Sequence, residues 1–584
     1  MVKNTPTICS FCNNGCGMFI RSDGQEAIGC LPMTHHPVSE GRLCHRGWNR
    51  FQNLRSFNRL SLPLVREGSD LKEVSWPVAL QKAAEKISEL LSRYGAQSVG
   101  VIGSPWLTNE DNYRIARFSR GILGTPHVDG SYRFSGASAL SAFDRLFPGS
   151  FGSLGSISAI AQTPSILVIG KESCRDFAPI GSRIIKAFLQ GSTVVLSDPL
   201  CTRKEHFFNA HLSHPIQNLA EALRDKENLQ PELSSRLFQP GVALIFLADQ
   251  VDCASSLMSL VQSLSQRQSE DRGLPLMLPL SRSPNLKGAW DMGVKPRENG
   301  LTLHEMLAQE SPVKGIILFG DDLLNHLPSS SMLAKFRSLE FVLVADRFFT
   351  ETARKAHAVL PLPLLAETQG TMTNSEGRVQ KLRPFLGSPK ESCSVADILH
   401  ELSRHLGKDF PLLSELDVRK EIGRIIPLYE KAASEPDLDE VGGVLLPAPS
   451  APLSFEIAEH QEQATQGNGY KLLVQNTLYA WNRNHMIHES PVLSIEYPSE
   501  RPAVRMSPLD ARELKIRMGE KAKLRSGHGE TTVPVAVDEN IPSKTLMLPS
   551  HFLEALESLA GKAIHDITGR TLFFPSLSVT VEKI

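Results

Sequence analysis

Four cysteines near the start of the chain constrain its fold more than any other feature. Cys9, Cys12, Cys16 and Cys44 follow a C-x2-C-x3-C-x27-C pattern. Three thiolates within eight residues, joined by a fourth from a separate turn, have the uneven spacing that commonly holds a 4Fe–4S cluster. Structural zinc is one alternative, although zinc usually takes two separated close pairs of ligands. Ordinary core or disulfide cysteines are the other. The pattern predicts a small domain built around a metal centre.

The residues around these cysteines suit such a domain. Residues 1–58 contain short segments broken by Gly and Pro instead of long periodic runs. Glycines there let the backbone turn tightly, so that its N–H groups can face cluster sulfurs. Arg46 and Arg50 come just after Cys44 and could stabilise a negatively charged cluster or bridge it to an anionic neighbour. A solvated basic turn is the alternative for these two arginines.

Length and charge set the broad class of the protein. The 584 residues exceed a single hydrophobic core, so we expect three or four domains. The chain has 62 Lys and Arg against 63 Asp and Glu, a formal net charge of -1, which gives no electrostatic footprint for nucleic acid or an anionic membrane. No apolar run approaches the ~18 residues that span a bilayer.

The compartment is predicted from the cysteines and the N-terminus. The first residues carry neither a signal-peptide pattern nor a twin arginine. The five cysteines outside the pattern are scattered, as in proteins of a reducing compartment. We therefore expect a cytoplasmic protein, unless a partner carries it through a membrane.

The central part of the chain alternates between helical and strand patterns. Apolar residues recur at helical spacing from Trp76 to Leu91 and again over residues 109–123. Between helices lie continuous apolar runs that end in Gly or Asp, at residues 98–103, 165–170, 192–199, 242–249, 315–322 and 341–346. Such runs are typical of parallel strands covered on both faces. The predicted fold class is α/β, with doubly wound parallel sheets.

Glycines and aspartates follow these predicted strands. Ligands of open α/β sheets sit beyond the carboxyl ends of the strands, where glycine admits phosphate and aspartate accepts ribose or guanine donors. The residues at these ends are Gly170, Asp198, Gly320, Asp321, Asp322 and Asp346. No GxGxxG or Walker motif is present, so nicotinamide and ATP sites are not supported. Each aspartate alone could simply cap the next helix, and their recurrence favours a binding site.

The C-terminal part changes character. Residues 431–468 lack periodicity and include the stretch LPAPSAP, which predicts a linker between domains. Residues 469–584 hold short strands separated by turns with Gly and Pro, at 471–475, 521–526, 531–537 and 546–550. This pattern predicts a β-barrel domain.

Nearly the whole chain resembles the molybdopterin oxidoreductases, a family that contains formate dehydrogenases, nitrate reductases and the G subunit of respiratory NADH dehydrogenase. Beyond the four cysteines, the resemblance rests on HPVSEGRLCHRG (36–47), NLKGAWDMG (285–293), DRFFTETA (346–353), ETQGTMTNSEGRVQ (367–380) and RMSPLDARELKIRMGE (505–520). The NSEGRVQ wording is closer to the NADH dehydrogenase subunit than to formate dehydrogenases.

The resemblance implies a domain plan and cofactors. An N-terminal iron–sulfur domain (1–58) would precede two interleaved α/β domains, one from 59–134 and 326–430 and the other from 135–325. A double-psi β-barrel (469–584) would follow. Two guanylyl-pterins holding molybdenum or tungsten (Mo/W-bis-MGD) would bind in the cleft between the domains. Arg46 stands where the family has a lysine between cluster and pterin, and the other candidate cofactor-binding residues are Gly170, Asp198, Gly320, Asp322 and Asp346.

The catalytic stretch departs from the family pattern. Formate dehydrogenases carry a cysteine or selenocysteine metal ligand followed at once by a catalytic histidine, and Ser135 and Gly136 stand at these positions. Serine ligates molybdenum through an alkoxide in members that transfer oxygen atoms, so Ser135 is a candidate metal ligand. A plain buried or loop serine is the alternative. Glycine offers no acid, base or hydrogen bond, so proton abstraction or hydride acceptance loses a participant.

Other stretches that face the cofactor are also changed. Leu200 replaces the arginine of a family D-P-R, and residues 214–217, 476–479 and 557–561 replace the family's P-G-T-D, T-G-R and N-x-L-T stretches. Each cation removed from a diphosphate site weakens the binding free energy of the diphosphate by ~1–3 kcal/mol. Together the losses predict weak binding of one or both pterins.

Two functions follow from these observations. The first is an iron–sulfur electron-transfer and scaffold subunit of a larger oxidoreductase complex, without a working molybdenum site. Its partners would be other redox subunits, iron–sulfur or flavin proteins linked to NADH or quinone, with no nucleic acid and no direct membrane span. The second is a catalytic, formate dehydrogenase-like Mo/W enzyme with Ser135 as metal ligand. A scaffold protein with a structural zinc site and no redox role is a third hypothesis.

Overall fold

The structure is a computed structural model of the chain. It describes residues 2–23, 26–147, 151–200, 206–214, 216–224, 241–251, 254–265, 275–327, 330–386, 392–439, 441–449, 469–475, 485–497, 503–549, 552–560, 564–565, 572–573 and 577–584.

The N-terminal domain is a small antiparallel meander that carries the cysteines. Strands β1 (Lys3–Ile8), β2 (Gly17–Ser22) and β3 (Ala27–Pro32) pair in that order, and the short helix α1 (His45–Trp48) and the 3-10 turn η1 (Gln52–Arg55) follow. Ile8 pairs with Gly17, so the loop that contains the first three cysteines is the β1–β2 connection. The hairpin register therefore fixes where these thiols emerge.

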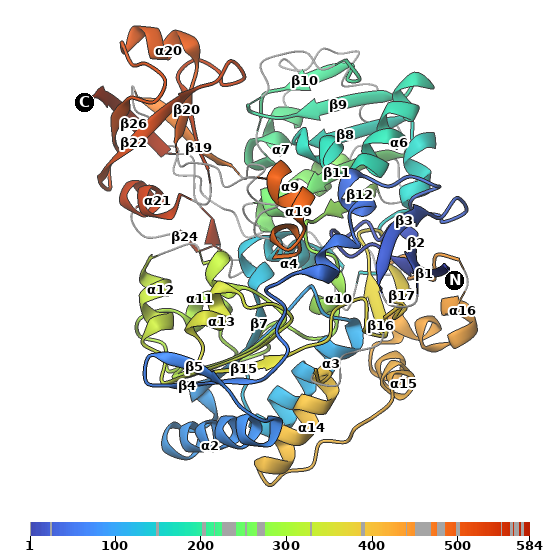
Figure 1. Cartoon of the computed structure of the whole chain (residues 1–584). Coiled ribbons are helices and arrows are strands. Elements are labelled where there is room, and N and C mark those ends of the chain that lie inside the picture. Colours follow the sequence, from blue (N-terminus) through green and yellow to red (C-terminus); the bar gives the residue numbers. More distant parts are fainter. Residues whose placement is uncertain are drawn as a thin grey trace.

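The larger α/β sheet has seven strands in the order β5-β4-β15-β14-β13-β6-β7 (Figure 1). Their bounds are Asp70–Glu73, Leu64–Glu67, Ala358–Pro361, Phe341–Asp346, Gly315–Phe319, Val99–Gly103 and Val128–Gly130. From β15 to β7 the strands are parallel, and β4 joins β15 antiparallel.

Alternating strand residues of this sheet enter two separate cores. Ile317 lies in a core with helices α2 (Trp76–Tyr94), α3 (Asn109–Phe118) and α14 (Val395–His405). Its neighbour Ile316 lies in another with α11 (Leu303–Met306), α12 (Ser330–Arg337) and α13 (Glu351–Lys355). Because successive strand residues point to opposite faces, helices cover both sides of the sheet, as predicted.

The smaller α/β sheet is entirely parallel, in the order β10-β9-β8-β11-β12. Its strands are Ala210–Leu212, Thr193–Ser197, Ser165–Ile169, Val242–Leu247 and Leu276–Leu280. One face packs on α6 (Ala178–Leu189) and η5 (Ile157–Gln162), and the other on α4 (Ala137–Leu146), α7 (Ile216–Arg224) and α9 (Ala254–Ser265). This sheet is also doubly wound.

The two α/β domains interleave, with two differences from the predicted boundaries. Strand β13 lies within the range 135–325 but belongs to the seven-stranded sheet, so the second segment of that domain begins before Gly315. Residues 431–449 hold α16 (Glu435–Asp439) and β18 (Val444–Leu445), and β18 joins a three-stranded sheet with β16 (Gly370–Thr373) and β17 (Arg378–Leu382). That half of the predicted linker is therefore packed structure, and residues 450–468 lie outside the described residues.

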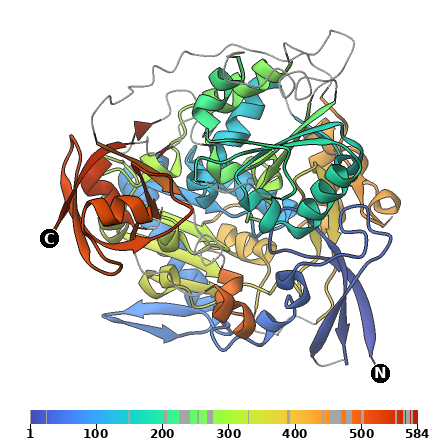
Figure 2. The ribbon, with the colours of Figure 1, turned by 90° about the horizontal axis from the view of Figure 1, so that it is seen from above.

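The C-terminal domain is a closed six-stranded barrel in the order β19-β23-β20-β22-β21-β26. Its strands are Tyr470–Gln475, Thr545–Pro549, Val504–Met506, Glu530–Val537, Lys521–Arg525 and Leu577–Lys583, with helices α20 (Pro508–Glu513) and α21 (Leu553–Ala560). The barrel and the N-terminal meander lie on opposite sides of the α/β domains (Figures 1 and 2). Between β19 and β20, helices α18 (His485–His488) and α19 (Pro491–Glu496) leave the barrel.

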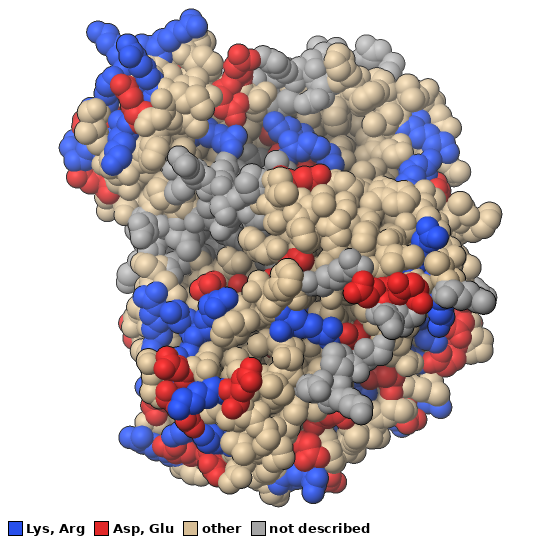
Figure 3. Space-filling view, viewed as in Figure 1, with Lys and Arg blue, Asp and Glu red and all other residues tan. Residues whose placement is uncertain are grey.

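The surface matches the balanced composition. On the face in Figure 3, Lys and Arg are interspersed with Asp and Glu over the domain of the seven-stranded sheet. Among the described residues, no helix has both the length and the apolar character that crossing a bilayer requires.

Candidate metal centre and sheet edges

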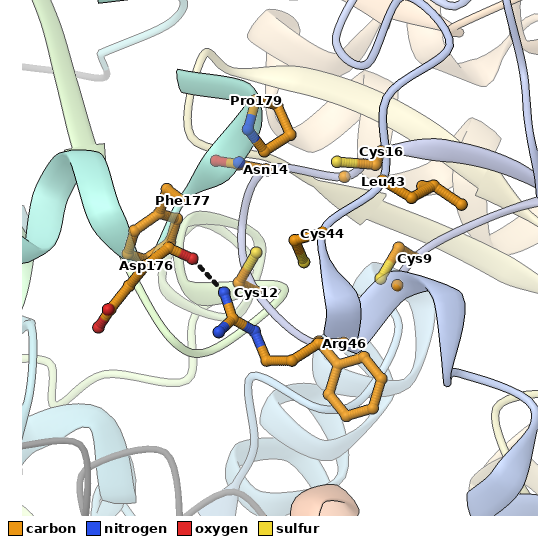
Figure 4. A pocket seen from close by; sticks show the side chains of 13 residues that line it. Cys9, Cys12, Asn14, Cys16, Leu43, Cys44, Arg46, Asp176, Phe177 and Pro179 are labelled. Atoms are coloured by element: carbon orange, nitrogen blue, oxygen red, sulfur yellow. Dashed lines mark hydrogen bonds between the residues drawn. The ribbon is translucent and has the colours of Figure 1, made fainter. Parts of the chain in front are cut away.

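Cys9, Cys12, Cys16 and Cys44 line one cavity (Figure 4). Three come from the β1–β2 loop, and Cys44 immediately precedes α1. The first three are buried and Cys44 is partly exposed. The rest of the wall is Phe11, Asn14, Gly15, Leu43, Arg46, Gly47, Asp176, Phe177 and Pro179. The structure thus brings all four predicted ligands together.

Residues from both α/β domains hold the cysteine loop in shape. The Asn13 side chain donates to the carbonyl of Pro279 at 2.8 Å and accepts from the Ser281 amide at 2.7 Å. Gln380 Nε2 donates to the carbonyl of Gly15 at 2.9 Å. Gly15 has φ +67°, and a Cβ there would lie 2.0 Å from the Gln380 side chain, so the loop requires glycine. The role of Gln380 was not predicted, because its partner is 365 residues away.

The electrostatics of the cavity suit a metal cluster. Burial, together with the neighbouring thiolates, raises the pKa of Cys9 and Cys16 well above the usual range. Burial likewise raises the pKa of Cys12 to about 11. Without bound metal the buried thiols keep their protons. Iron binding would displace these protons and balance the negative charge of the thiolates. Such a donor set fits a 4Fe–4S cluster.

A single metal ion fits this arrangement less well. Four thiolates around one zinc ion all lie about 2.3 Å from a common point. The four thiols instead stand around a cavity (Figure 4), which favours a cluster of several irons over zinc.

Two buried arginines flank the cysteines, so the alternative of a solvated basic turn is wrong. Arg46 and Arg50 are 2% and 5% exposed. Arg46 Nη1 donates to the Tyr497 hydroxyl at 2.7 Å, and Nη2 donates to the carbonyl of Asp176 (dashed line in Figure 4). Burial opposes the charge of Arg46, but Cys44, Tyr497 and Cys12 together raise its pKa. Arg50 donates to Ser10 Oγ at 3.1 Å.

At the carboxyl edge of the five-stranded sheet, the polar groups bind one another. The Asp198 carboxylate accepts from the amides of Lys171 and Leu200, at 3.2 and 2.9 Å, and so caps a turn. Gly170 has φ +72°. The Gln250 side chain occupies the space next to its Cα, where an added Cβ would lie 2.3 Å from Gln250 Oε1.

A buried charge cluster completes this edge. Arg282 follows β12 and pairs with Asp176 at 3.1 Å and with Asp249. The arginine is 8% exposed, and its charge is balanced by these two carboxylates. Asp198 and Arg282 thus have partners within the protein. Among the described residues, the buried Oε1 of Gln250 and Oε2 of Glu172 have no hydrogen-bond partner.

The carboxyl edge of the seven-stranded sheet differs. Asp322 Oδ1 accepts from the Thr352 amide and hydroxyl at 3.0 and 2.6 Å, and Asp321 accepts from Ser131 Oγ. Asp346 Oδ1 accepts from the Arg347 amide at 2.6 Å. Among the described residues, Asp346 Oδ2 and Arg347 Nη1 have no hydrogen-bond partner, although both residues are buried.

Gly320 lies beside these groups. Its φ is +64°, and a Cβ there would lie 3.3 Å from Arg347 Nη1. A carboxyl group and a guanidinium donor thus lie next to a glycine, and this edge fits the polar groups of a nucleotide.

Ser135 and Gly136 lie between the turn η4 (Ser131–Phe134) and α4. The Ser135 amide donates to the Tyr132 carbonyl at 2.9 Å. A Cβ on Gly136 would lie 2.9 Å from a Leu286 methyl and 3.6 Å from Ala248 Cβ, so aliphatic groups fill the space of a histidine side chain. Of the other changed stretches, residues 476–479 and positions 215 and 561 lie outside the described residues.

Three family models match successive parts of the chain. They are the molybdopterin oxidoreductase Fe4S4 domain over residues 2–54, molybdopterin oxidoreductase over 59–405, and the molydopterin dinucleotide binding domain over 472–573. They follow the order of the meander, the two α/β domains and the barrel.

Known proteins with similar sequences or structures agree with these matches. The F420-dependent formate dehydrogenase subunit alpha of Methanocaldococcus jannaschii is 26% identical, over 100% of this chain and 99% of that protein. The NADPH-Fe(3+) oxidoreductase subunit alpha of Geobacter sulfurreducens is 25% identical, over 94% and 72%. Acetylene hydratase from Pelobacter acetylenicus superposes with a TM-score of 0.67 over 99% of this chain and 100% of that chain, at 15% identity, which shows a shared fold.

The four cysteines around one cavity, the interleaved sheets and the closed barrel thus coincide with the three matched segments. The oxidoreductase model alone covers more than half of the chain. The chain belongs to the molybdopterin oxidoreductase family and contains both its Fe4S4 domain and its dinucleotide-binding domain.

Proposed function

We propose that this chain is an iron–sulfur electron-transfer and scaffold subunit of a larger oxidoreductase complex, without a working molybdenum site. The observation that carries the proposal is the packing of Gly136 against Leu286 and Ala248. At the place of the family's catalytic histidine there is no acid, base or hydrogen-bond donor, and a side chain there would first have to displace the Leu286 methyl groups.

The five-stranded edge supports the same proposal. Gln250 covers Gly170, and Arg282 is neutralised by Asp176 and Asp249. A diphosphate there would have to displace a side chain and break a buried charge cluster, which costs several kcal/mol. Leu200 supplies no replacement cation.

A second candidate function is a catalytic Mo/W enzyme, formate dehydrogenase-like, with Ser135 as metal ligand. The buried Asp346 Oδ2 and Arg347 Nη1, which lack partners among the described residues, favour it, because they suit a bound nucleotide. The full-length similarity to a formate dehydrogenase alpha subunit supports it as well.

The partners we propose are other redox subunits, iron–sulfur or flavin proteins linked to NADH or quinone. Their support is that the similar proteins are themselves named as subunits. The compartment we propose is the cytoplasm. Cys30 and Cys393 are free thiols, which supports a reducing environment.

Elemental and nucleotide analysis of the purified chain tests the proposal. We expect about four irons per chain, with molybdenum, tungsten and released GMP all well below one per chain. Full metal and two guanylyl-pterins per chain would overturn the proposal.

The variant Ser135→Ala separates the two candidates. For an electron-transfer subunit it leaves iron content and the redox behaviour of the cluster unchanged. For the catalytic enzyme it abolishes turnover or alters the spectroscopic signal of the metal. Gly136→Ala probes the aliphatic packing at the neighbouring position, and we expect it to lower stability without changing the metal content.

A further inference from the structure

The segment between barrel strands β19 and β20 packs on the N-terminal domain. Ser490 Oγ and the Val492 amide both donate to Gln52 Oε1, at 2.9 and 3.2 Å. The buried residues Met486, Ile487, Leu493 and Tyr497 share one apolar core with Cys9, Cys12 and Cys16. Figure 1 shows α19 apart from the barrel, near the middle of the molecule. Residues 485–497 therefore form a strap from the C-terminal domain to the metal centre.

Tyr497, at the end of this strap, contacts the two residues that follow Cys44. Its hydroxyl accepts from Arg46 Nη1 at 2.7 Å and lies 2.5 Å from His45 Nε2. Its ring stacks on the His45 ring, with centroids 5.6 Å apart and planes inclined by 23°. The tyrosine is 6% exposed, so water competes little for these contacts.

Arg46 is the cationic residue of the cavity wall. Its guanidinium is held from one side by Tyr497 and from the other by the Asp176 carbonyl. The charges of Cys44 and Cys12 act on it, so it lies close enough to influence a cluster bound to those sulfurs. Reduction adds an electron to an already anionic cluster, and a nearby fixed cation stabilises the reduced form more than the oxidised form.

We propose that Tyr497 is a positioning residue of the iron–sulfur centre, which fixes Arg46 beside Cys12 and Cys44 and thereby raises the reduction potential of the cluster. The strap is then the connection through which the C-terminal domain acts on the cluster. This inference rests on the Fe4S4 domain and holds whether or not the chain carries molybdenum.

The test is a mediated redox titration of the full-length chain, followed by the electron paramagnetic resonance signal of the reduced cluster. Tyr497→Phe keeps the ring stacked on His45 and removes the hydroxyl. We expect the midpoint potential to become more negative, because Arg46 loses one anchor. Arg46→Gln should shift the potential in the same direction, and Tyr497→Phe should add little in the Arg46→Gln background, since the effect passes through that guanidinium.

A matched control is Tyr470→Phe. Tyr470 is a buried tyrosine of the barrel whose hydroxyl lies 3.4 Å from Lys544 Nζ, and its loss should leave the potential unchanged. The resonance signal reports only molecules that hold a reduced cluster, so partial loss of iron does not hide the result. An unchanged potential in Tyr497→Phe, or an equal shift with and without Arg46, would overturn the inference. Neither result bears on the molybdenum and GMP content that tests the proposed function.

Discussion

Asp346 ends β14 with one carboxylate oxygen bonded and, among the described residues, the other without a partner. The pattern of aspartates after strands grouped it with Asp198, Asp321 and Asp322, and the structure separates them. Asp198 and Asp322 accept from backbone amides and cap turns. From the sequence, each aspartate could either cap the next turn or helix or bind a ligand. Which of these roles it takes depends on residues far away along the chain. Asp321 also keeps one carboxylate oxygen without a hydrogen-bond partner among the described residues, although His326 Nε2 lies 3.3 Å from it.

Burial raises the pKa of Asp346 from 3.8 to about 8, although Arg347 opposes the shift. The folded state therefore binds a proton that the unfolded state releases, and stability falls as the pH rises between these two values. Asp346→Asn removes the ionisation. We expect wild type and variant to melt alike below about pH 4, and the variant to be more stable by several kcal/mol near about pH 8. Thermal unfolding at both pH values measures this.

The control for this prediction is Asp198→Asn, which disturbs a carboxylate that accepts two backbone N–H bonds. It should lower the melting temperature at both pH values. A difference between Asp346→Asn and wild type that did not depend on pH would contradict the assignment of a buried ionisable carboxyl.

At the scale of elements, the β1–β2 loop owes its shape to segments outside the N-terminal domain. The hairpin register presents the cysteines, but Asn13 is bound by residues 279–281 and the Gly15 carbonyl by Gln380. The loop is therefore a shared element of three domains. The family resemblance singled out the EGRVQ stretch, and the structure shows that its Gln380 donates to the Gly15 carbonyl of the cysteine loop.

Gln380→Met tests this clamp with a side chain of similar volume. The variant leaves the buried Gly15 carbonyl without its donor, at a cost of ~1–3 kcal/mol. We expect the cluster to be lost to a chelator about tenfold faster, or more, as followed by the absorbance of the cluster. Gln81→Met, on the exposed face of α2, is the matched control and should not change the rate. Equal rates in wild type and Gln380→Met would refute the clamp.

At the scale of the whole molecule, every domain contributes residues that line the cavity or contact the residues around it. The five-stranded domain contributes Asp176, Phe177 and Pro179 to the cavity. The β16–β17 hairpin binds the cysteine loop, and Tyr497 of the C-terminal part contacts Arg46. The first 58 residues supply the ligands, and the remainder of the chain supplies the environment. We therefore expect removal of the cluster to change the local stability of segments in the other domains.

Hydrogen exchange with and without iron tests this coupling. Once iron is removed, buried thiols stand close together without a cation to bind them, and the loop loosens. We expect faster amide exchange in residues 13–16, 279–283 and 374–380, which contact the loop, and unchanged exchange in barrel strands β21 and β22. Faster exchange confined to the N-terminal domain would show that the other domains do not depend on the cluster.

The sequence by itself indicated the four cysteines that line one cavity, the α/β class with its doubly wound sheets, and the C-terminal barrel, because cysteine spacing and hydrophobic periodicity are local properties. Only the tertiary structure decided that β13 belongs to the larger sheet, that Gly136 is enclosed by Leu286 and Ala248, and that Tyr497 holds Arg46. Arg46 and Tyr497 are 451 residues apart. No local pattern encodes such a contact, since it forms only when the packed domains bring distant segments together.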